Sequence, residues 1–346
     1  MINKMKAIAA FGKYPIEDVR VLLDIEIDKP VPQDHDILVK IAGISVNPID
    51  FKTRMLIESE DQSRILGFDA IGTVSEIGAD VTNFVVGDKV FYLGVNNRSG
   101  SNEEYQLVDE RLVGHAPKKI MTAEAVAIPL TGVTAWESLF EKLAFVPKKD
   151  ANQGQSILII NGAGGVGSIA IQLAKWAGIK VITTASRPET IDWVKKMGAD
   201  IVINHRKDLK KQLDELGIHE VDGILMLHST ELYFNVASEL IKPRGIVMSI
   251  VATTAELPLS ILKNKSNDFK WLTIFTKGIY HTADMASQGA TLNQLAKLLD
   301  DGSIKSTMTK SIEGINADNL RAATKTVEGG AMIGKLVITG EFDAEV

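Results

Sequence analysis

Apolar residues follow two different patterns along the chain. Up to about residue 128 they come in short runs rich in beta-branched side chains and separated by Gly, Asp, Asn or Pro, as in residues 36–46, 70–78 and 87–94. Such runs predict short strands and a beta-rich region. Near Pro129 the pattern changes, and wholly apolar runs begin to alternate with helical segments.

The alternating part predicts a parallel sheet with helices on both faces, because strands buried on both sides read as continuous apolar runs. Their shortness and flanking glycines favour strands over fragments of buried helix. After residue 284 the pattern changes again, to two helices and two strands. The expected fold class is mixed α/β, and 346 residues suit about two domains. The strands expected between residues 129 and 283 are 156–161, 180–186, 200–204, 222–227 and 245–251, and the helices are 166–178, 188–198 and 233–241.

Composition narrows the chemistry. The 38 Lys and Arg against 44 Asp and Glu give a net charge of −6 without a basic run, which argues against nucleic acid as a partner. Cysteine is absent, which excludes disulfides, a thiolate nucleophile and cysteine-ligated zinc. No run of 18 apolar residues predicts a membrane span, and the N-terminus does not read as a signal peptide, so the expected location is the cytoplasm.

A glycine-rich turn is the strongest motif. Gly162-x-Gly164-x-x-Gly167 follows an apolar run and opens a predicted helix, which is the context of a dinucleotide-binding turn. Gly162 permits the tight turn, Gly164 lets a pyrophosphate approach the backbone, and Gly167 lets helix and strand pack closely. The N–H groups at the helix start, at Gly165 and Val166, would face the phosphates. The alternative is a glycine-rich turn that serves packing alone.

The end of the next strand bears on the choice of cofactor. An NAD site usually carries an acid there to bind the ribose 2′-hydroxyl, but this chain has Ala185, Ser186 and Arg187. A hydroxyl and a guanidinium suit a 2′-phosphate, so the sequence favours NADPH over NADH. Otherwise Arg187 is an ordinary solvated arginine beside a turn proline.

Several further segments resemble the medium-chain dehydrogenase/reductase superfamily, quinone oxidoreductase branch, and within it the zinc-type alcohol dehydrogenase-like group. The resemblance covers essentially the whole chain. It implies a GroES-like beta domain over 1–128 and 284–346, with a Rossmann NADP-binding domain inserted over 129–283. The segments that carry the resemblance are GISVNPIDFKTR, RILGFDAIGTVSEIG, GDKVFYLG, GSNEEYQLVDERLV, AIPLTGVTAWESLF, NGAGGVG and GKLVITG.

The chain departs from the zinc-dependent members at their metal ligands. Ser45 stands where they carry a cysteine, and Phe68 and Asp69 stand where they carry His and Glu. No metal site is therefore expected. Without a Lewis acid, hydrogen-bond donors must polarise the substrate oxygen, which favours substrates already primed to accept hydride, such as quinones and conjugated enones.

Three residues of the first domain are candidates for the reacting centre. Asn47 lies in the segment that carries metal or substrate groups across the superfamily, and its amide can donate to a substrate oxygen; alternatively it closes an Asx-turn beside Pro48. Asp50 is expected to anchor the loop more than to act as a base. Tyr92 either donates its phenol to the substrate or is a core or rim tyrosine.

The resemblance also assigns residues to the cofactor. Thr131 matches a threonine against the nicotinamide, or else only starts a helix. Ile250 and Val251 end a central strand, where ligands collect in open parallel sheets. Lys335 matches a cationic position near the pyrophosphate, or is a surface lysine. His205 matches a position near the adenosine phosphate in quinone reductases.

These residues predict a cytoplasmic, zinc-independent, NADPH-dependent reductase of quinones or α,β-unsaturated carbonyl compounds that works by direct hydride transfer. A non-catalytic NADPH-binding or structural protein is one alternative, and a zinc-containing alcohol dehydrogenase is another. A homodimer is expected, paired through the apolar, strand-like segment 271–279.

Overall fold

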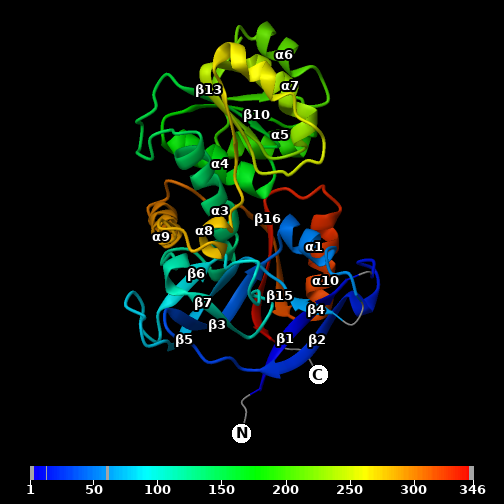
Figure 1. Ribbon diagram of the computed structural model, residues 1–346, viewed down its shortest axis with the longest axis vertical. Coiled ribbons are helices and arrows are strands. Elements are labelled where there is room, and N and C mark those ends of the chain that lie inside the picture. Colours follow the sequence, from blue (N-terminus) through cyan, green and yellow to red (C-terminus); the bar gives the residue numbers. More distant parts are fainter. Residues whose placement is uncertain (1–3, 13, 60–61, 343–346) are drawn as a thin grey trace. The chain divides into compact units, whose positions relative to one another are not determined.

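The chain forms two compact units. The computed structural model describes residues 4–12, 14–59 and 62–342 (Figure 1). The first unit contains Met1–Val133 and Ile274–Val346, and the second contains Thr134–Thr273. The unit boundaries at 133/134 and 273/274 lie within about ten residues of the expected domain boundaries at 128/129 and 283/284. The exact domain boundaries stay a prediction.

The first unit is beta-rich, as its short apolar runs indicated. One sheet has the order β15-β16-β3-β5-β6-β8, with β7 also paired to β3, and a smaller sheet has the order β2-β1-β4. Its strands are β1 (Lys4–Phe11), β2 (Leu22–Asp28), β3 (Asp36–Ser45), β4 (Ser63–Ile65), β5 (Ala70–Ile77), β6 (Lys89–Tyr92), β7 (Tyr105–Asp109), β8 (Val113–His115), β15 (Met308–Ile315) and β16 (Lys335–Phe342). Its helices are α1 (Pro48–Arg54), α2 (Thr122–Val126), α8 (Thr276–Ile279), α9 (Ser287–Asp300), α10 (Ala317–Glu328) and the first part of α3 (Pro129–Trp136).

The last part of the chain completes the sheet of the first part. Strand β16 pairs antiparallel with β3, with Ser45 opposite Val337 and Ile44 opposite Ile338. On its other edge β3 pairs antiparallel with β5, with Ile44 opposite Ala70. The C-terminal end of β3 therefore lies beside the N-terminal ends of both β5 and β16. Residues from three distant segments meet at this point.

The second unit is a six-stranded, wholly parallel sheet of order β11-β10-β9-β12-β13-β14. This confirms the strand–helix alternation read from the sequence. The strands are β9 (Ser156–Ile160), β10 (Lys180–Thr184), β11 (Ile201–Ile203), β12 (Val221–Met226), β13 (Ile241–Ser249) and β14 (Asp268–Trp271), and the main helices are α4 (Gly165–Trp176), α5 (Pro188–Lys196), α6 (Leu209–Glu215) and α7 (Thr230–Leu240).

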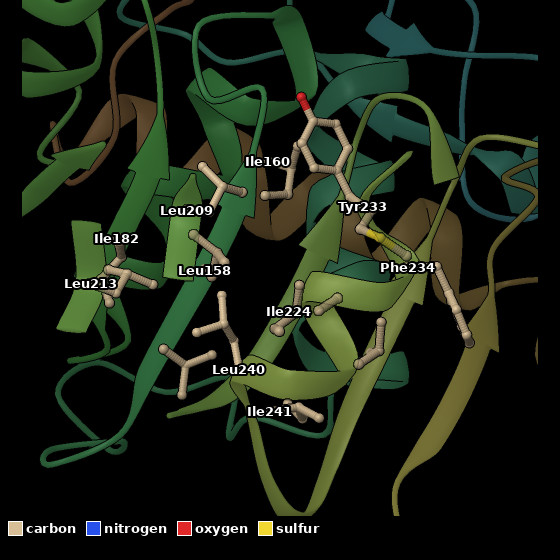
Figure 2. Packing of buried hydrophobic residues seen from close by; sticks show 14 of the residues in the cluster. Leu158, Ile160, Ile182, Leu209, Leu213, Ile224, Tyr233, Phe234, Leu240 and Ile241 are labelled. Atoms are coloured by element: carbon tan, nitrogen blue, oxygen red, sulfur yellow. The ribbon is translucent and has the colours of Figure 1, made fainter. Parts of the chain in front are cut away.

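Alternate residues of the central strands enter one apolar core. Leu158 and Ile160 of β9 point the same way and pack with side chains of α6 and α7, among them Leu213 and Phe234 (Figure 2). Ile157 and Ile159 are equally buried but, by strand alternation, face the opposite side, where α4 packs against β9 and β10. Because both faces are covered, the strand reads as an unbroken apolar run.

The segment expected to pair two copies is not one strand. Only its first residue, Trp271, belongs to the edge strand β14, and residues 276–279 form α8. The expectation of a strand over 271–279 is therefore wrong. Its apolar side chains serve cores within the chain: Leu272 and Phe275 are buried, and the Phe275 ring lies 4.9 Å from that of Phe68. The homodimer stays a prediction.

Candidate functional site

Asp69 is the centre of a buried polar cluster at the strand ends of the first unit. Its carboxylate is fully buried, and Oδ2 accepts hydrogen bonds from Ser45 Oγ at 2.6 Å and Asn47 Nδ2 at 2.7 Å. Its other oxygen, Oδ1, accepts the backbone N–H of Leu130 at 2.7 Å, in the first turn of α3. A carboxylate is well placed there, because a helix start offers free N–H groups and a positive dipole end. Asp69 is thereby locked in position.

Lys335 supplies the positive charge of this cluster. Its side chain is 4% exposed, and the ammonium donates to Val46 O at 2.9 Å, Asn47 Oδ1 at 2.5 Å and Asp69 Oδ2 at 3.2 Å. An ammonium has three N–H donors, so these bonds use all of them. The expected contact with a cofactor pyrophosphate stays a prediction, but the cluster leaves the ammonium no N–H for a phosphate.

Asn47 uses both ends of its amide within the cluster. The side chain makes no capping bond to α1, so it does not close the Asx-turn considered above. Instead, Nδ2 donates to Asp69, and Oδ1 accepts from Lys335. The cap comes from Asp50 instead, whose Oδ2 accepts the backbone N–H of Asn47 at 2.5 Å. Asp50 thus occupies the anchoring position that the sequence favoured for it.

Burial shifts the acid–base properties of this site. Desolvation raises the pKa of Asp50 to about 7, although the Asn47 N–H and the Lys335 charge oppose the shift. Its Oδ1 is buried without a hydrogen bond among the described residues, and Asp50 is one of the residues that line a small cavity of about 20 Å³. Desolvation lowers the pKa of Lys335, and the charges of Asp69 and Asp50 oppose that. The two carboxyl groups therefore sense the same ammonium.

Tyr92 and Thr131 lie in the interior of the first unit. The Tyr92 side chain is fully buried at the end of β6, its hydroxyl has no partner among the described residues, and desolvation raises its pKa well above the ordinary value. This is the environment of a core tyrosine. Thr131 donates back to Ala127 O at 3.2 Å and Ile128 O at 3.3 Å, as a buried helical threonine does. Contacts of either residue with a ligand stay predictions.

The donor set of the cluster does not fit zinc. Zinc in proteins is held by thiolate, imidazole and carboxylate groups. Here the carboxyl groups of Asp69 and Asp50 lie among hydroxyl, amide and ammonium groups without a thiolate or imidazole, and Phe68 packs in the core. Among the residues that the structure describes, no group of three His, Cys, Asp or Glu side chains could hold a metal ion.

The glycine-rich turn of the second unit fits a dinucleotide. A Cβ on Gly162 would lie 2.0 Å from Thr183 Oγ1, and one on Gly167 would lie 2.5 Å from Asn161 O, so strand and helix packing require both glycines. At Gly164 the nearest atom would be 3.4 Å away, an ordinary van der Waals contact, so packing within the chain does not require this glycine. Gly164, Gly165 and Val166 are only half-buried, and the N–H groups of the first turn of α4 have no partner within the helix.

The other cofactor candidates of this unit follow strands of the same parallel sheet. Thr184 lies opposite Ile203 in the β10–β11 pair, and Ser186 and His205 each follow the carboxyl end of one of these two strands. Burial and the Arg206 charge lower the pKa of His205, which favours its neutral form. Ile250 and Val251 follow β13, where the Thr230 hydroxyl donates to Val251 O. Carboxyl ends of parallel strands share one edge of the sheet, the usual ligand edge in this architecture.

Two participants were not singled out from the sequence. Asp69 had been considered only as a replaced metal ligand, although an acid directly before an apolar strand was a usable signal. Glu189 was missed entirely: its Oε1 lies 3.1 Å from Arg187 Nε, in the first turn of α5. A carboxylate therefore lies beside the guanidinium that is expected to bind the 2′-phosphate.

Known proteins resemble this chain over nearly its whole length. Residues 33–136 match the alcohol dehydrogenase GroES-like domain, and residues 165–301 match the zinc-binding dehydrogenase family. A zinc-type alcohol dehydrogenase-like protein of Staphylococcus aureus is 48% identical over 96% of this chain and 99% of its own. An NADPH-dependent alkenal/one oxidoreductase of Arabidopsis thaliana is 35% identical over 60% of this chain and 54% of its own.

Solved structures agree on the fold. A Rhizobium etli protein described as a zinc-dependent alcohol dehydrogenase superposes with a TM-score of 0.92 at 41% identity, covering 98% of this chain and 99% of that one. The Escherichia coli quinone oxidoreductase complexed with NADPH superposes with a TM-score of 0.78 at 25% identity, covering 97% and 100%. None of the helices in the described parts of the chain is long and apolar enough to cross a membrane. The chain belongs to the medium-chain dehydrogenase/reductase superfamily of oxidoreductases, within the zinc-type alcohol dehydrogenase-like group.

Proposed function

We propose that this chain is an NADPH-dependent, zinc-independent reductase of quinones or α,β-unsaturated carbonyl compounds. The observation that carries the proposal is the composition of the Asp69 cluster, whose hydroxyl, amide and ammonium groups replace the metal ligands expected in zinc-dependent relatives. A bound NADPH would supply a hydride to a ring carbon or to the β carbon, and the substrate oxygen would take a proton from water or a nearby donor.

The chemistry of the cluster favours activated substrates. Hydrogen-bond donors polarise an oxygen less than a metal ion does, so the substrate itself must accept hydride readily. Quinones and conjugated enones do so because the developing charge spreads over a conjugated system. The alkenal/one oxidoreductase and the quinone oxidoreductase described above act on this kind of substrate by name, which supports the same class here.

The cofactor follows from the second unit and from the same relatives. The half-buried turn at Gly164 presents the first N–H groups of α4, which suit a pyrophosphate, and Arg187 and Ser186 offer a cation and a hydroxyl to a 2′-phosphate. The Arabidopsis thaliana relative has NADPH in its name, and the Escherichia coli structure was solved in complex with NADPH. The residues of this chain that would bind it are Gly162, Gly164, Gly165, Val166, Gly167, Ser186, Arg187 and His205.

The decisive experiment is turnover by chelator-treated protein whose metal content has been measured. NADPH oxidation is followed with a panel of small quinones and enones, and NADP⁺ reduction with primary and secondary alcohols. We expect quinone or enone turnover that the chelator leaves unchanged. Alcohol turnover that the chelator abolishes and zinc restores would establish the zinc-dependent alternative. NADPH binding without turnover of any substrate would instead indicate a non-catalytic binding protein.

A further inference from the structure

Hydrogen bonds within the chain occupy most of the acceptors of the Asp69 cluster. Asp69 accepts four hydrogen bonds, from Ser45, Asn47, Lys335 and the backbone of Leu130. Oδ2 accepts three of these bonds and Oδ1 accepts one, so the oxygen that faces Lys335 is fully used. Val46 O and Asn47 Oδ1 also accept from the ammonium of Lys335.

The position of Lys335 is fixed by the backbone as well as by charge. It is the first residue of β16, its own N–H donates to Thr307 O at 2.8 Å, and two residues later Val337 lies opposite Ser45. The ammonium therefore reaches the end of β3 from a rigid strand. Together, the carboxylate, the amide oxygen, the carbonyl and the central positive charge form a cation site whose cation is covalently attached.

We propose that the Lys335 ammonium is the built-in cation of this site: it holds Asp69 and Asn47 in position, and it closes the site to metal ions. Lys335 is a positioning residue, because its side chain is buried and acts through Asn47 and Asp69. The inference extends the metal independence of the proposed function, but it concerns cation occupancy and can be tested without turnover.

Removing the ammonium should expose a latent cation site. In Lys335→Met, three oxygen acceptors lose the bond from the ammonium, and the Asp69 charge is left buried without its counter-ion. A cation from solution satisfies such a site, because oxygen acceptors and a carboxylate are suitable ligands. We expect this variant to be destabilised in chelator and restabilised by Co²⁺, which also provides a visible spectrum on binding.

Three variants make the test specific. Lys335→Met combined with Asp69→Asn removes both charges, so it should be insensitive to Co²⁺. Lys277→Met is the matched control: that lysine is also buried, but its ammonium bonds Ser287 Oγ and lies 3.7 Å from the exposed Asp284. It should leave the response to Co²⁺ unchanged. Melting temperature, Co²⁺ titration and NADPH binding are measured on every protein.

We expect Lys335→Met to bind Co²⁺ at least about tenfold more tightly than wild type. Equal melting temperatures of Lys335→Met and wild type in chelator would overturn the proposal, as would an equal Co²⁺ response of the single and double variants. If Lys335→Met does not fold in chelator, refolding in Co²⁺ decides: recovery supports the proposal, and failure while the double variant folds overturns it. Absence of reductase activity in wild type would contradict the proposed function, but the melting temperatures and Co²⁺ titrations would still test the role of Lys335.

Discussion

The carboxylate of Glu189 lies 3.1 Å from Nε of Arg187, the side chain expected to bind the 2′-phosphate of NADPH. A phosphate and Glu189 are both anions and would compete for the same guanidinium. We therefore predict that Arg187→Ala weakens NADPH binding by about 1.5–3 kcal/mol, the value of a charge-assisted hydrogen bond, and leaves NADH binding nearly unchanged. Titration of both cofactors against wild type and variant tests this.

Glu189→Gln should have the opposite effect. The pair is partly exposed, so releasing Arg187 from it should tighten NADPH binding by no more than about 1 kcal/mol. Asp214→Asn, which breaks the exposed pair with Lys210 in α6, is the matched control and should change neither cofactor affinity. Equal affinity of the wild type for NADPH and NADH, or an unchanged NADPH affinity in both Arg187→Ala and Glu189→Gln, would contradict a role for Arg187 in cofactor choice.

Asp50 should make stability depend on pH. Burial raises its pKa from an ordinary 3.8 to about 7, so the folded chain binds its proton more tightly than the unfolded chain does. The stabilisation from this proton is complete below about pH 4 and is lost as the pH rises toward 7, at no more than about 1.4 kcal/mol per pH unit. In Asp50→Asn, which can still accept the Asn47 N–H, this contribution should vanish.

The measurement is the free energy of unfolding of both proteins across pH 4–8. Other titrating groups contribute equally to the two curves, so their difference isolates Asp50. The wild-type curve should fall relative to that of Asp50→Asn between pH 4 and 7 and run parallel to it above. Parallel curves throughout would mean that Asp50 titrates near its ordinary value in the folded chain.

Asn47 should affect both stability and rate. Asn47→Ala removes a donor from Asp69 and an acceptor from Lys335, and a buried group left without its partner costs about 1–3 kcal/mol. Asn47→Asp should be worse, because it sets a second carboxylate against Asp69. If Asn47 also donates to the substrate oxygen, single-turnover hydride transfer per folded molecule falls by about 10²–10³. An unchanged rate per folded molecule would confine Asn47 to the structural role.

The sequence predicted what depends on local pattern. The buried strands of the second unit and the glycine turn follow from apolar runs and residue spacing, so both could be read before the structure. The Asp69 cluster could not, because it needs the register of β16 on β3 and of β5 on β3, which joins Lys335 to Asn47 across 288 positions. For the same reason the sequence could not show that the Lys335 side chain is buried against Asp69.

The helix over 276–279 illustrates a different limit. Residues 271–279 are apolar enough for a strand, but the strand ends at Trp271, and Leu272, Ile274 and Phe275 pack into cores within the chain. Short apolar runs suit either structure, and only tertiary packing decides between them. The pair between Glu189 and Arg187 could not be predicted from the sequence, because a single exposed acid in the first turn of a helix is commonly explained by its interaction with the helix dipole.

Substitution of Gly162 or Gly164 by alanine should distinguish an effect on folding from an effect on cofactor binding. Gly162→Ala would set a Cβ 2.0 Å from Thr183 Oγ1, inside the strand packing, so the second unit should be destabilised, by about 1–3 kcal/mol for overpacking. Gly164→Ala meets nothing closer than 3.4 Å, and its backbone, at φ −71° and ψ 173°, accepts alanine without strain. Its melting temperature should therefore stay near that of wild type.

Gly164→Ala, although it should leave stability unchanged, should weaken cofactor binding. The methyl group of Gly164→Ala occupies the space through which a pyrophosphate would approach the half-buried first turn of α4, so NADPH and NADH should both bind at least about tenfold more weakly. Because the pyrophosphate is common to both cofactors, their affinity ratio should not change, in contrast to Arg187→Ala. The assay is isothermal titration with each cofactor beside a thermal melt of the same sample. Full cofactor affinity in a stably folded Gly164→Ala would show that the turn serves packing alone, and the dinucleotide would have to bind elsewhere.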